Sequence, residues 1–183
     1  MEKLYGNKGN RLEEAVNFIA ILMIVLMSII LLLNTLVFMR VKVSGPSMEN
    51  TLQTGDFLFV NKLGKADYGD IIVVQANNKL VIKRLIAKGG DCVKIEDGNV
   101  FVKYFGEEEF TRLVEPYTKQ GITTVEPEAS TEWELKENEI FYLGDNRYES
   151  SDCRDYGPIN EKNIVGVVTG WSIKYKKILT KLN

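Results

Sequence analysis

A serine in a Gly-x-Ser-Met setting is the first candidate for chemistry in this chain. Ser47 lies in residues 43–52, Val-Ser-Gly-Pro-Ser-Met-Glu-Asn-Thr-Leu, shortly after a long apolar segment. A serine hydroxyl is a weak nucleophile at neutral pH and needs a positioned base that takes its proton. The chain contains no histidine, which excludes a Ser-His-Asp triad. A nucleophilic serine must therefore use a lysine, a carboxylate or the α-amine.

Lys83 is the lysine that the sequence pattern places in an apolar setting. It lies within residues 80–86, Leu-Val-Ile-Lys-Arg-Leu-Ile, and in an extended strand its side chain shares a face with Val81 and Leu85. Burial on that face would lower the pKa of the amine and let it accept a proton from serine. The pattern alone also allows a lysine that reaches solvent at a sheet edge.

Residues 15–39 form the element that would hold this chemistry at a membrane. They contain no charged residue in 25 positions, and a helix of that length spans about 37 Å, enough to cross a hydrocarbon core of about 30 Å. A cleavable signal peptide would have a shorter apolar region that ends in small residues. Here the run ends in Val-Phe-Met-Arg, so we interpret it as an uncleaved transmembrane anchor.

The flanks of the anchor set the expected topology. Residues 1–14 carry Lys3, Lys8 and Arg11, which favours a cytoplasmic N-terminus, and a large C-terminal domain is translocated with little regard to nearby charge. We therefore expect residues 40–183 to form an extracytoplasmic β-rich domain.

Short apolar runs separated by turn signals dominate that domain. The predicted strands are residues 57–60, 71–74, 80–86, 92–95, 100–104, 140–143 and 164–168. Their close spacing, with turn residues between them, predicts antiparallel coiled sheets that form a barrel-like domain or a sandwich. The acidic residues 105–138 break this pattern and are expected to form a surface insertion.

Charge and cysteine content exclude several classes of function. With 23 basic and 25 acidic residues the net charge is −2, which does not favour nucleic acid as a partner. Cys92 and Cys153 form no Cys-x-x-Cys pair, and without histidine the mixed Cys/His metal sets are missing. A disulfide between them would need an oxidising compartment, whereas lone cysteines are more often buried and inert.

Several ordered blocks resemble type I signal peptidases. Residues 45–52 resemble the signature around their nucleophile, residues 54–62 and 69–74 resemble the strands that follow, and Lys83-Arg84 resembles the segment with the lysine base. Residues 144–154, Gly-Asp-Asn-Arg-Tyr-Glu-Ser-Ser-Asp-Cys-Arg, resemble the Gly-Asp-Asn-Arg box of the family. The blocks cover about residues 43–95 and 139–171, so the chain is similar to the small single-anchor bacterial forms.

The resemblance implies a role for individual residues. Ser47 would be the nucleophile, Lys83 the general base and Ser150 the hydroxyl that orients the lysine, while the backbone N–H of Ser47 would donate to the oxyanion. Gly45 stands where some members have a second oxyanion donor, so none is assigned. The remaining supporting positions are Met48, Arg84, Asp145, Asn146, Arg147, Asp152 and Arg154; the charged and amide groups among them would hold the turns of the site together by charge-assisted bonds.

Two residues depart from the family pattern. Asn50 replaces the proline usual in Met-x-Pro-Thr-Leu, which loosens the turn after the nucleophile. Cys153 replaces a serine of the Ser-x-Asp-Ser-Arg pattern and, without a histidine partner, is interpreted as a small isostere.

The function implied by the resemblance is that of a membrane-bound serine endopeptidase of the plasma membrane that removes N-terminal signal peptides from exported preproteins. It would need no cofactor and no metal. Its partners would be signal peptides and the lipid bilayer, with no nucleic acid, and association with the secretion machinery is left open.

Two other classes of function are open on the sequence. A self-cleaving Ser/Lys protease related to the repressors of the SOS response would be soluble and carry DNA-binding elements, whereas this N-terminus is a membrane span. A catalytically silent membrane-anchored β-domain could instead bind exported proteins or assist a peptidase complex, and only Asn50 encourages that interpretation.

Overall fold

The computed structural model describes residues 2–118, 124–125, 130–173 and 177–180. The chain divides into two compact units, Met1–Phe38 and Met39–Asn183. Each unit is described by itself.

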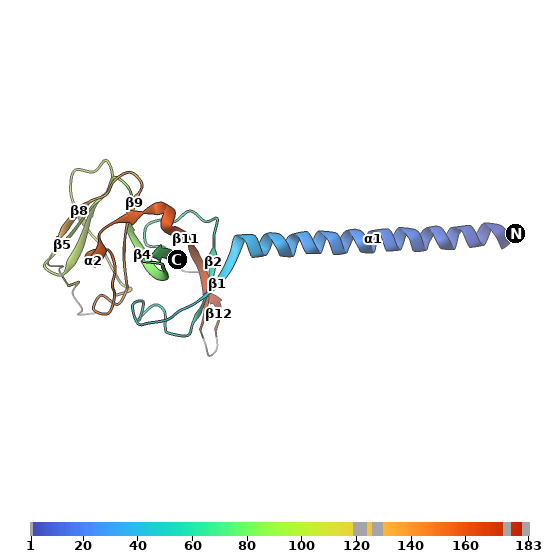
Figure 1. Ribbon diagram of the computed structural model, residues 1–183, viewed down its shortest axis with the longest axis horizontal. Helices are drawn as coiled ribbons and strands as arrows, with labels where there is room; N and C mark the ends of the chain where they lie inside the picture. Colours follow the sequence, from blue (N-terminus) through green and yellow to red (C-terminus); the bar gives the residue numbers. More distant parts are fainter. Residues whose placement is uncertain (1, 119–123, 126–129, 174–176, 181–183) are drawn as a thin grey trace. The chain divides into compact units, whose positions relative to one another are not determined.

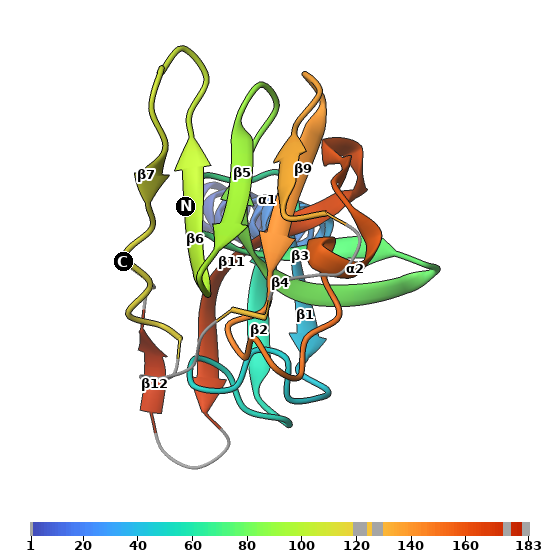
Figure 2. The same ribbon diagram turned by 90° about the vertical axis from the view of Figure 1, so that its left-hand side faces the viewer.

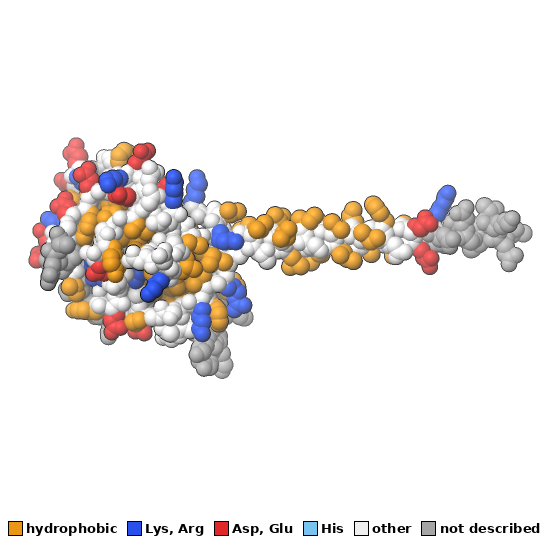
Figure 3. Space-filling view, viewed as in Figure 1, with side chains coloured by type: hydrophobic (Ala, Val, Ile, Leu, Met, Phe, Trp, Pro, Cys, Tyr) orange, Lys and Arg blue, Asp and Glu red, His pale blue; other side chains and the backbone are white. Residues whose placement is uncertain are grey.

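The N-terminal unit is a single helix, α1 (Glu2–Val37). Its segment Arg11–Val37 is long and apolar enough to cross a membrane, and an 18-residue stretch of it has a mean hydropathy of 3.0. Apolar side chains lie along its surface (Figure 3). Ser28 and Asn34 donate side-chain hydrogen bonds of 2.8 Å and 2.9 Å to carbonyl oxygens one turn earlier, so these polar groups are satisfied within the helix. The helix ends at Val37 rather than at residue 39, because the next five residues form a strand.

The regular structure of the second unit consists mainly of strands (Figure 1). The strands are β1 (Phe38–Lys42), β2 (Phe57–Asn61), β3 (Ile71–Ala76), β4 (Lys79–Ala87), β5 (Cys92–Glu96), β6 (Asn99–Lys103), β7 (Thr111–Arg112), β8 (Glu132–Glu134), β9 (Glu139–Leu143), β10 (Ile159–Asn160), β11 (Ile164–Ile173) and β12 (Lys177–Thr180). The helical elements are α2 (Cys153–Tyr156) and a 3₁₀ turn, η1 (Glu161–Asn163).

The strands form two sheets. The larger has the order β1-β2-β11-β3-β4-β9-β10, with β12 paired to β11, and the smaller has the order β7-β6-β5-β8. Every pairing whose register is described is antiparallel. Figure 2 shows β5, β6 and β7 of the smaller sheet side by side. The predicted antiparallel β fold is confirmed, although neither sheet closes into a barrel among the strands that the structure describes.

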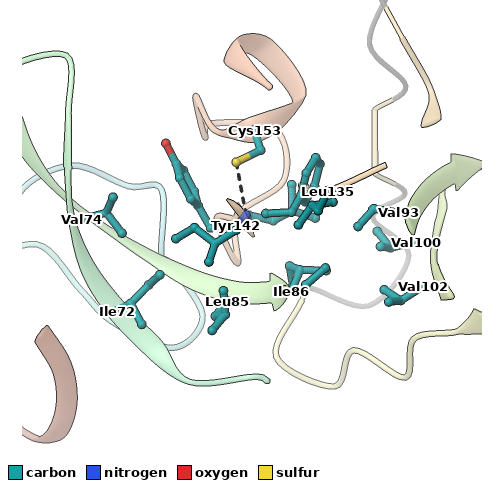
Figure 4. Packing of buried hydrophobic residues seen from close by; sticks show 14 of the residues in the cluster. Ile72, Val74, Leu85, Ile86, Val93, Val100, Val102, Leu135, Tyr142 and Cys153 are labelled. Carbon is teal, nitrogen blue, oxygen red and sulfur yellow. Dashed lines mark hydrogen bonds between the residues drawn. The ribbon is translucent and has the colours of Figure 1, made fainter. Parts of the chain in front are cut away.

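The larger sheet is covered on both faces. Alternate residues of β3 enter different clusters: Ile72 and Val74 pack in one, Ile71 and Val73 in the other, as the two-residue period of a strand requires. The first cluster joins the sheets, because Leu85 and Ile86 of the larger sheet pack with strand residues of the smaller one (Figure 4). Burial on both faces explains why the strands appear as continuous apolar runs in the sequence.

All seven predicted apolar runs lie in or across strands, with boundaries that differ by one or a few residues. Residues 105–138, expected as a surface insertion, contribute β7 and β8 to the smaller sheet. Leu135 of this stretch is buried in the first cluster, and Leu113 packs against it. Parts of the expected insertion, residues 119–123 and 126–129, lie outside the described residues.

Candidate active site

Ser47 lies in a turn that is fixed at both ends. The N–H of Val43 donates to the carbonyl of Asp56 at 2.9 Å, and the N–H of Gly55 donates to the carbonyl of Val43 at 3.0 Å. Met48 and Leu52 are buried in the second cluster, and the N–H of Leu52 donates to the carbonyl of Met48 at 2.8 Å. Apolar anchors on the C-terminal side of Ser47 therefore hold this turn against the sheet.

Lys83 is buried in β4, with 4% of its surface exposed. Its Nζ donates a 2.7 Å hydrogen bond to Ser150 Oγ. Burial lowers the pKa of Lys83 below its ordinary value, and the charge of Asp152 opposes that shift in part. The prediction of a buried lysine is thus confirmed, and the alternative of a solvent-exposed one is wrong.

Ser150 is held from its other side by Asp152. Ser150 Oγ lies 2.7 Å from Asp152 Oδ2, and Arg154 Nε donates to Asp152 Oδ1 at 2.8 Å. Burial would raise the pKa of Asp152, but the hydrogen bonds and charge of Arg154, with further bonds to the carboxylate, hold it below its ordinary value. Asp152 also caps α2 by accepting from the N–H of Arg154. The ionised carboxylate therefore fixes the hydroxyl that contacts the lysine.

Ser47 and Lys83 line the same cavity, which has a volume of about 130 Å³. Residues 41–45 form one part of its lining and residues 80–82 another, and Met48 completes it. A hydroxyl and a buried amine with a lowered pKa on one small cavity are the groups that a Ser/Lys dyad requires.

Gly144 lies where the serine turn meets the lysine's partner. A Cβ at this position would lie 2.2 Å from Ser150 Oγ and 2.5 Å from the carbonyl oxygen of Ser47. The N–H of Asn146 donates to that same carbonyl at 3.0 Å, and Asn146 Nδ2 donates to the carbonyl of Pro46 at 3.1 Å. The Gly-Asp-Asn segment therefore sets the distance between the serine turn and Ser150.

The buried pair Arg84–Asp145 supports this segment. Arg84 Nε and Nη2 donate to the two oxygens of Asp145 at 2.8 Å and 2.6 Å, and Nη1 donates to the carbonyl of Gly69 at 2.7 Å. Thr51 Oγ1 donates to Asp145 as well. Two parallel bonds between a guanidinium and a carboxylate give a rigid geometry, which ties β4 to the residues after Ser47.

Arg147 has partners that sequence reasoning missed. Its guanidinium is buried and contacts Glu115 and Thr124, both from the stretch expected to be a surface insertion. Tyr117 of the same stretch lies under Arg84, with 3.9 Å from Cζ to the ring centroid. The sequence Glu-Pro-Tyr at residues 115–117 contains no motif or periodicity that would predict its contacts with Arg147 and Arg84.

Cys153, one of the two departures from the signal peptidase pattern, lies in the core, and Asn50, the other, lies in the turn after Ser47. Cys153 is fully buried and accepts a 3.3 Å hydrogen bond from the N–H of Tyr142 (Figure 4), and burial raises the pKa of its thiol. Both cysteines are free thiols.

Asn50 has a φ of 88°, in the left-handed region that asparagine tolerates and proline cannot adopt.

Supporting positions differ in how close they lie to the cavity. Gly45 and Met48 line it. Asn146 contacts the serine turn directly. Arg84, Asp145, Asp152 and Arg154 act through the bonds already described, and Arg147 donates from Nε to the carbonyl of Gly144 at 3.0 Å.

Comparisons with known proteins show the family of this chain. Residues 15–171 match the model of the family described as "Signal peptidase, peptidase S26". Signal peptidase I V of Bacillus subtilis is 33% identical over 148 residues, covering 73% of this chain and 84% of that protein. Signal peptidase I of Bacillus licheniformis is 31% identical over 178 residues, covering 90% of each.

The chain is also similar to solved structures. A signal peptidase I from Enterococcus faecalis aligns with 58% of this chain and 98% of its own, at 26% identity and a TM-score of 0.48. On the family match and the Bacillus relatives, this membrane-anchored chain belongs to the signal peptidase family, peptidase S26.

Proposed function

We propose that this chain removes signal peptides from exported preproteins, with Ser47 as the nucleophile and Lys83 as the general base. The observation that carries the proposal is that Ser47 lines the same cavity as a buried lysine. Relatives named signal peptidase I supply the substrate class.

The reaction has two halves. Ser47 Oγ attacks the scissile carbonyl carbon while the uncharged Lys83 Nζ takes the hydroxyl proton, and the backbone N–H of Ser47 donates to the oxyanion. The C–N bond then breaks as the Lys83 ammonium gives its proton to the leaving amine, leaving an acyl-enzyme. A water molecule, deprotonated by Lys83, hydrolyses that ester and regenerates Ser47.

The size of the cavity favours small substrate side chains. Its volume of about 130 Å³ leaves little room beside the reacting groups, and its lining includes Val41, Val43 and Ile82. An extended substrate with small side chains before the scissile bond fits such a site, with strand-like backbone pairing as its main source of affinity.

The anchor gives the reaction its location. We place the N-terminus in the cytoplasm and the β unit on the outer side of the plasma membrane, because the basic residues before the helix favour a cytoplasmic position. In that orientation the enzyme meets signal peptides as they leave the secretion machinery.

Cleavage of a preprotein tests the function directly. Purified protein in detergent, mixed with a preprotein whose junction is Ala-x-Ala, should make a single cut at the junction, and Ser47→Ala and Lys83→Ala should each abolish it. Lys79→Ala is the matched control, because Lys79 is an exposed lysine of the same strand, and it should cleave normally. Intact preprotein that binds measurably to the unmutated chain would instead favour a catalytically silent binding domain.

A further inference from the structure

Arg147 is a buried cation whose partners come from distant parts of the chain. Only 2% of its surface is exposed. Its Nε donates to the carbonyl of Gly144 at 3.0 Å, and its Nη1 donates to Thr124 Oγ1 at 2.6 Å and to Glu115 Oε2 at 3.0 Å. Its Nη2 donates to Glu115 Oε1. Glu115 therefore receives the guanidinium through two bonds and supplies its countercharge.

The other end of Arg147 reaches the backbone between the two reacting groups. Gly144, which accepts from Arg147 through its carbonyl, donates its N–H to Asp152 Oδ2 at 3.0 Å. Asp152 accepts from Ser150, the partner of Lys83. A displaced guanidinium would thus move the backbone that holds both Ser150 and the serine turn.

The stretch that supplies Glu115 is itself fixed. Thr118 donates to the carbonyl of Glu115 through its N–H at 3.1 Å and its hydroxyl at 2.9 Å. The Tyr117 hydroxyl donates to Glu115 Oε1 at 3.0 Å, while its ring lies under Arg84. The N–H of Thr124 donates at 2.9 Å to the carbonyl of Gly98, in the turn between β5 and β6. The smaller sheet therefore supports these contacts.

We propose that Glu115 is a positioning residue of the peptidase reaction, which acts through Arg147 to fix the Gly144 backbone between Ser47 and Ser150. The inference rests on the proposed function. It assigns a role in the reaction to Glu115, which lies in the stretch expected to be a surface insertion.

Glu115→Gln is the variant that tests this role. It keeps the volume of the side chain and removes the countercharge. We expect kcat for preprotein cleavage to fall about tenfold, since small misplacements of reacting groups carry large rate penalties, while KM stays within twofold. The rise of rate with pH should also shift toward higher pH, because a looser Ser150 admits water to Lys83 and raises the pKa of its amine.

Two controls separate positioning from folding. Glu109→Gln changes an exposed acid of the same acidic stretch and should cleave at the unmutated rate, and Glu115→Asp, which keeps the charge, should recover part of kcat. All variants are assayed well below their unfolding temperatures, so that the fraction folded is equal and a purely structural role would leave kcat and the pH profile unchanged.

A double-mutant cycle tests the route through Arg147. If Glu115 acts through Arg147, then Glu115→Gln should change kcat by less than twofold in an Arg147→Met background. A full tenfold effect in that background, or a Glu115→Gln enzyme with unchanged kcat and pH profile, would overturn the inference. If Arg147→Met does not fold, Glu115→Gln alone decides. Failure of the proposed function looks different, because the unmutated chain would then leave the preprotein intact, or Ser47→Ala would still cleave it.

Discussion

Lys83 Nζ donates its hydrogen bond to Ser150 Oγ, and Ser150 Oγ in turn lies within hydrogen-bond distance of Asp152 Oδ2. Because an ionised carboxylate only accepts, the hydroxyl proton of Ser150 points to Asp152 and its lone pairs remain for the lysine. An uncharged amine has two hydrogens and one lone pair. The bond to Ser150 uses one hydrogen, so the lone pair stays available for the proton of Ser47.

The rate of cleavage should depend on pH through Lys83. The lysine is active when uncharged, and burial lowers its pKa, so kcat/KM should rise with pH and level off below the ordinary lysine pKa of about 10.4. Initial rates between pH 5 and pH 10, at constant ionic strength, measure the midpoint. A profile that is flat from pH 6 to 9 would contradict the role of Lys83 as base.

Replacing Lys83 by methionine should stabilise the fold while abolishing activity. The folded-state pKa is lowered, so between that value and about 10.4 the unfolded state binds more protons and stability rises with pH. At pH 7 the lysine of the unfolded chain is charged and fully solvated, so burial of the amine costs stability, and Lys83→Met should raise the free energy of unfolding by about 1 kcal/mol. Denaturant unfolding at pH 7 measures this, and a less stable Lys83→Met would show that the amine contributes net stability.

A methyl group at residue 144 should block the site. Gly144→Ala would place a Cβ 2.2 Å from Ser150 Oγ and 2.5 Å from the carbonyl of Ser47, so we expect kcat to fall at least 100-fold. Gly64→Ala is the matched control, because its Cβ would come no closer than 3.3 Å to the side chain of Asn61 and 3.5 Å to the carbonyl oxygen of the same residue. Preprotein cleavage by the two variants should differ sharply, and equal rates would mean that the site relaxes around the added group.

Restoring the family proline should damage this chain. Asn50 has a φ of 88°, whereas proline holds φ near −65°, so Asn50→Pro must rebuild the turn after Ser47 and should lower the free energy of unfolding by at least about 1 kcal/mol. Asn50→Gly, which accepts positive φ, should be tolerated. Thermal unfolding and cleavage assays of both variants test this, and an Asn50→Pro enzyme as stable as the unmutated chain would show that the turn accommodates proline at no cost.

Strands with apolar runs could be predicted because their signal is local. Residues 71–74 are apolar at every position since the sheet is buried on both faces, and the alternation around Lys83 placed the amine among apolar neighbours. β7 and β8 were missed for the opposite reason: they have two and three residues, mostly exposed, and only their pairing with β6 and β5 makes them strands. β1 was not predicted, because its first two residues continue the apolar run of the helix.

Supporting contacts of the candidate site were harder to predict, because they depend on residues distant in sequence. Glu115 lies 32 residues from Arg147, and Tyr117 meets Arg84 through the face of its ring. Neither contact has a sequence period or a motif. The box at residues 144–154 could be located by its resemblance, but which of its charges face the insertion depends on the fold.

The position of β11 has a consequence for how the protein is made. β11 pairs with β2 on one side and with β3 on the other, so it joins the half of the sheet next to Ser47 to the half that carries Lys83. Synthesis runs from the N-terminus, so Ser47 and Lys83 are made well before residues 164–173. Pairings between segments that are distant in sequence also form slowly. The nascent chain should therefore be inactive through most of its synthesis, and proteolysis should begin only after β11 has been made and has paired with β2 and β3.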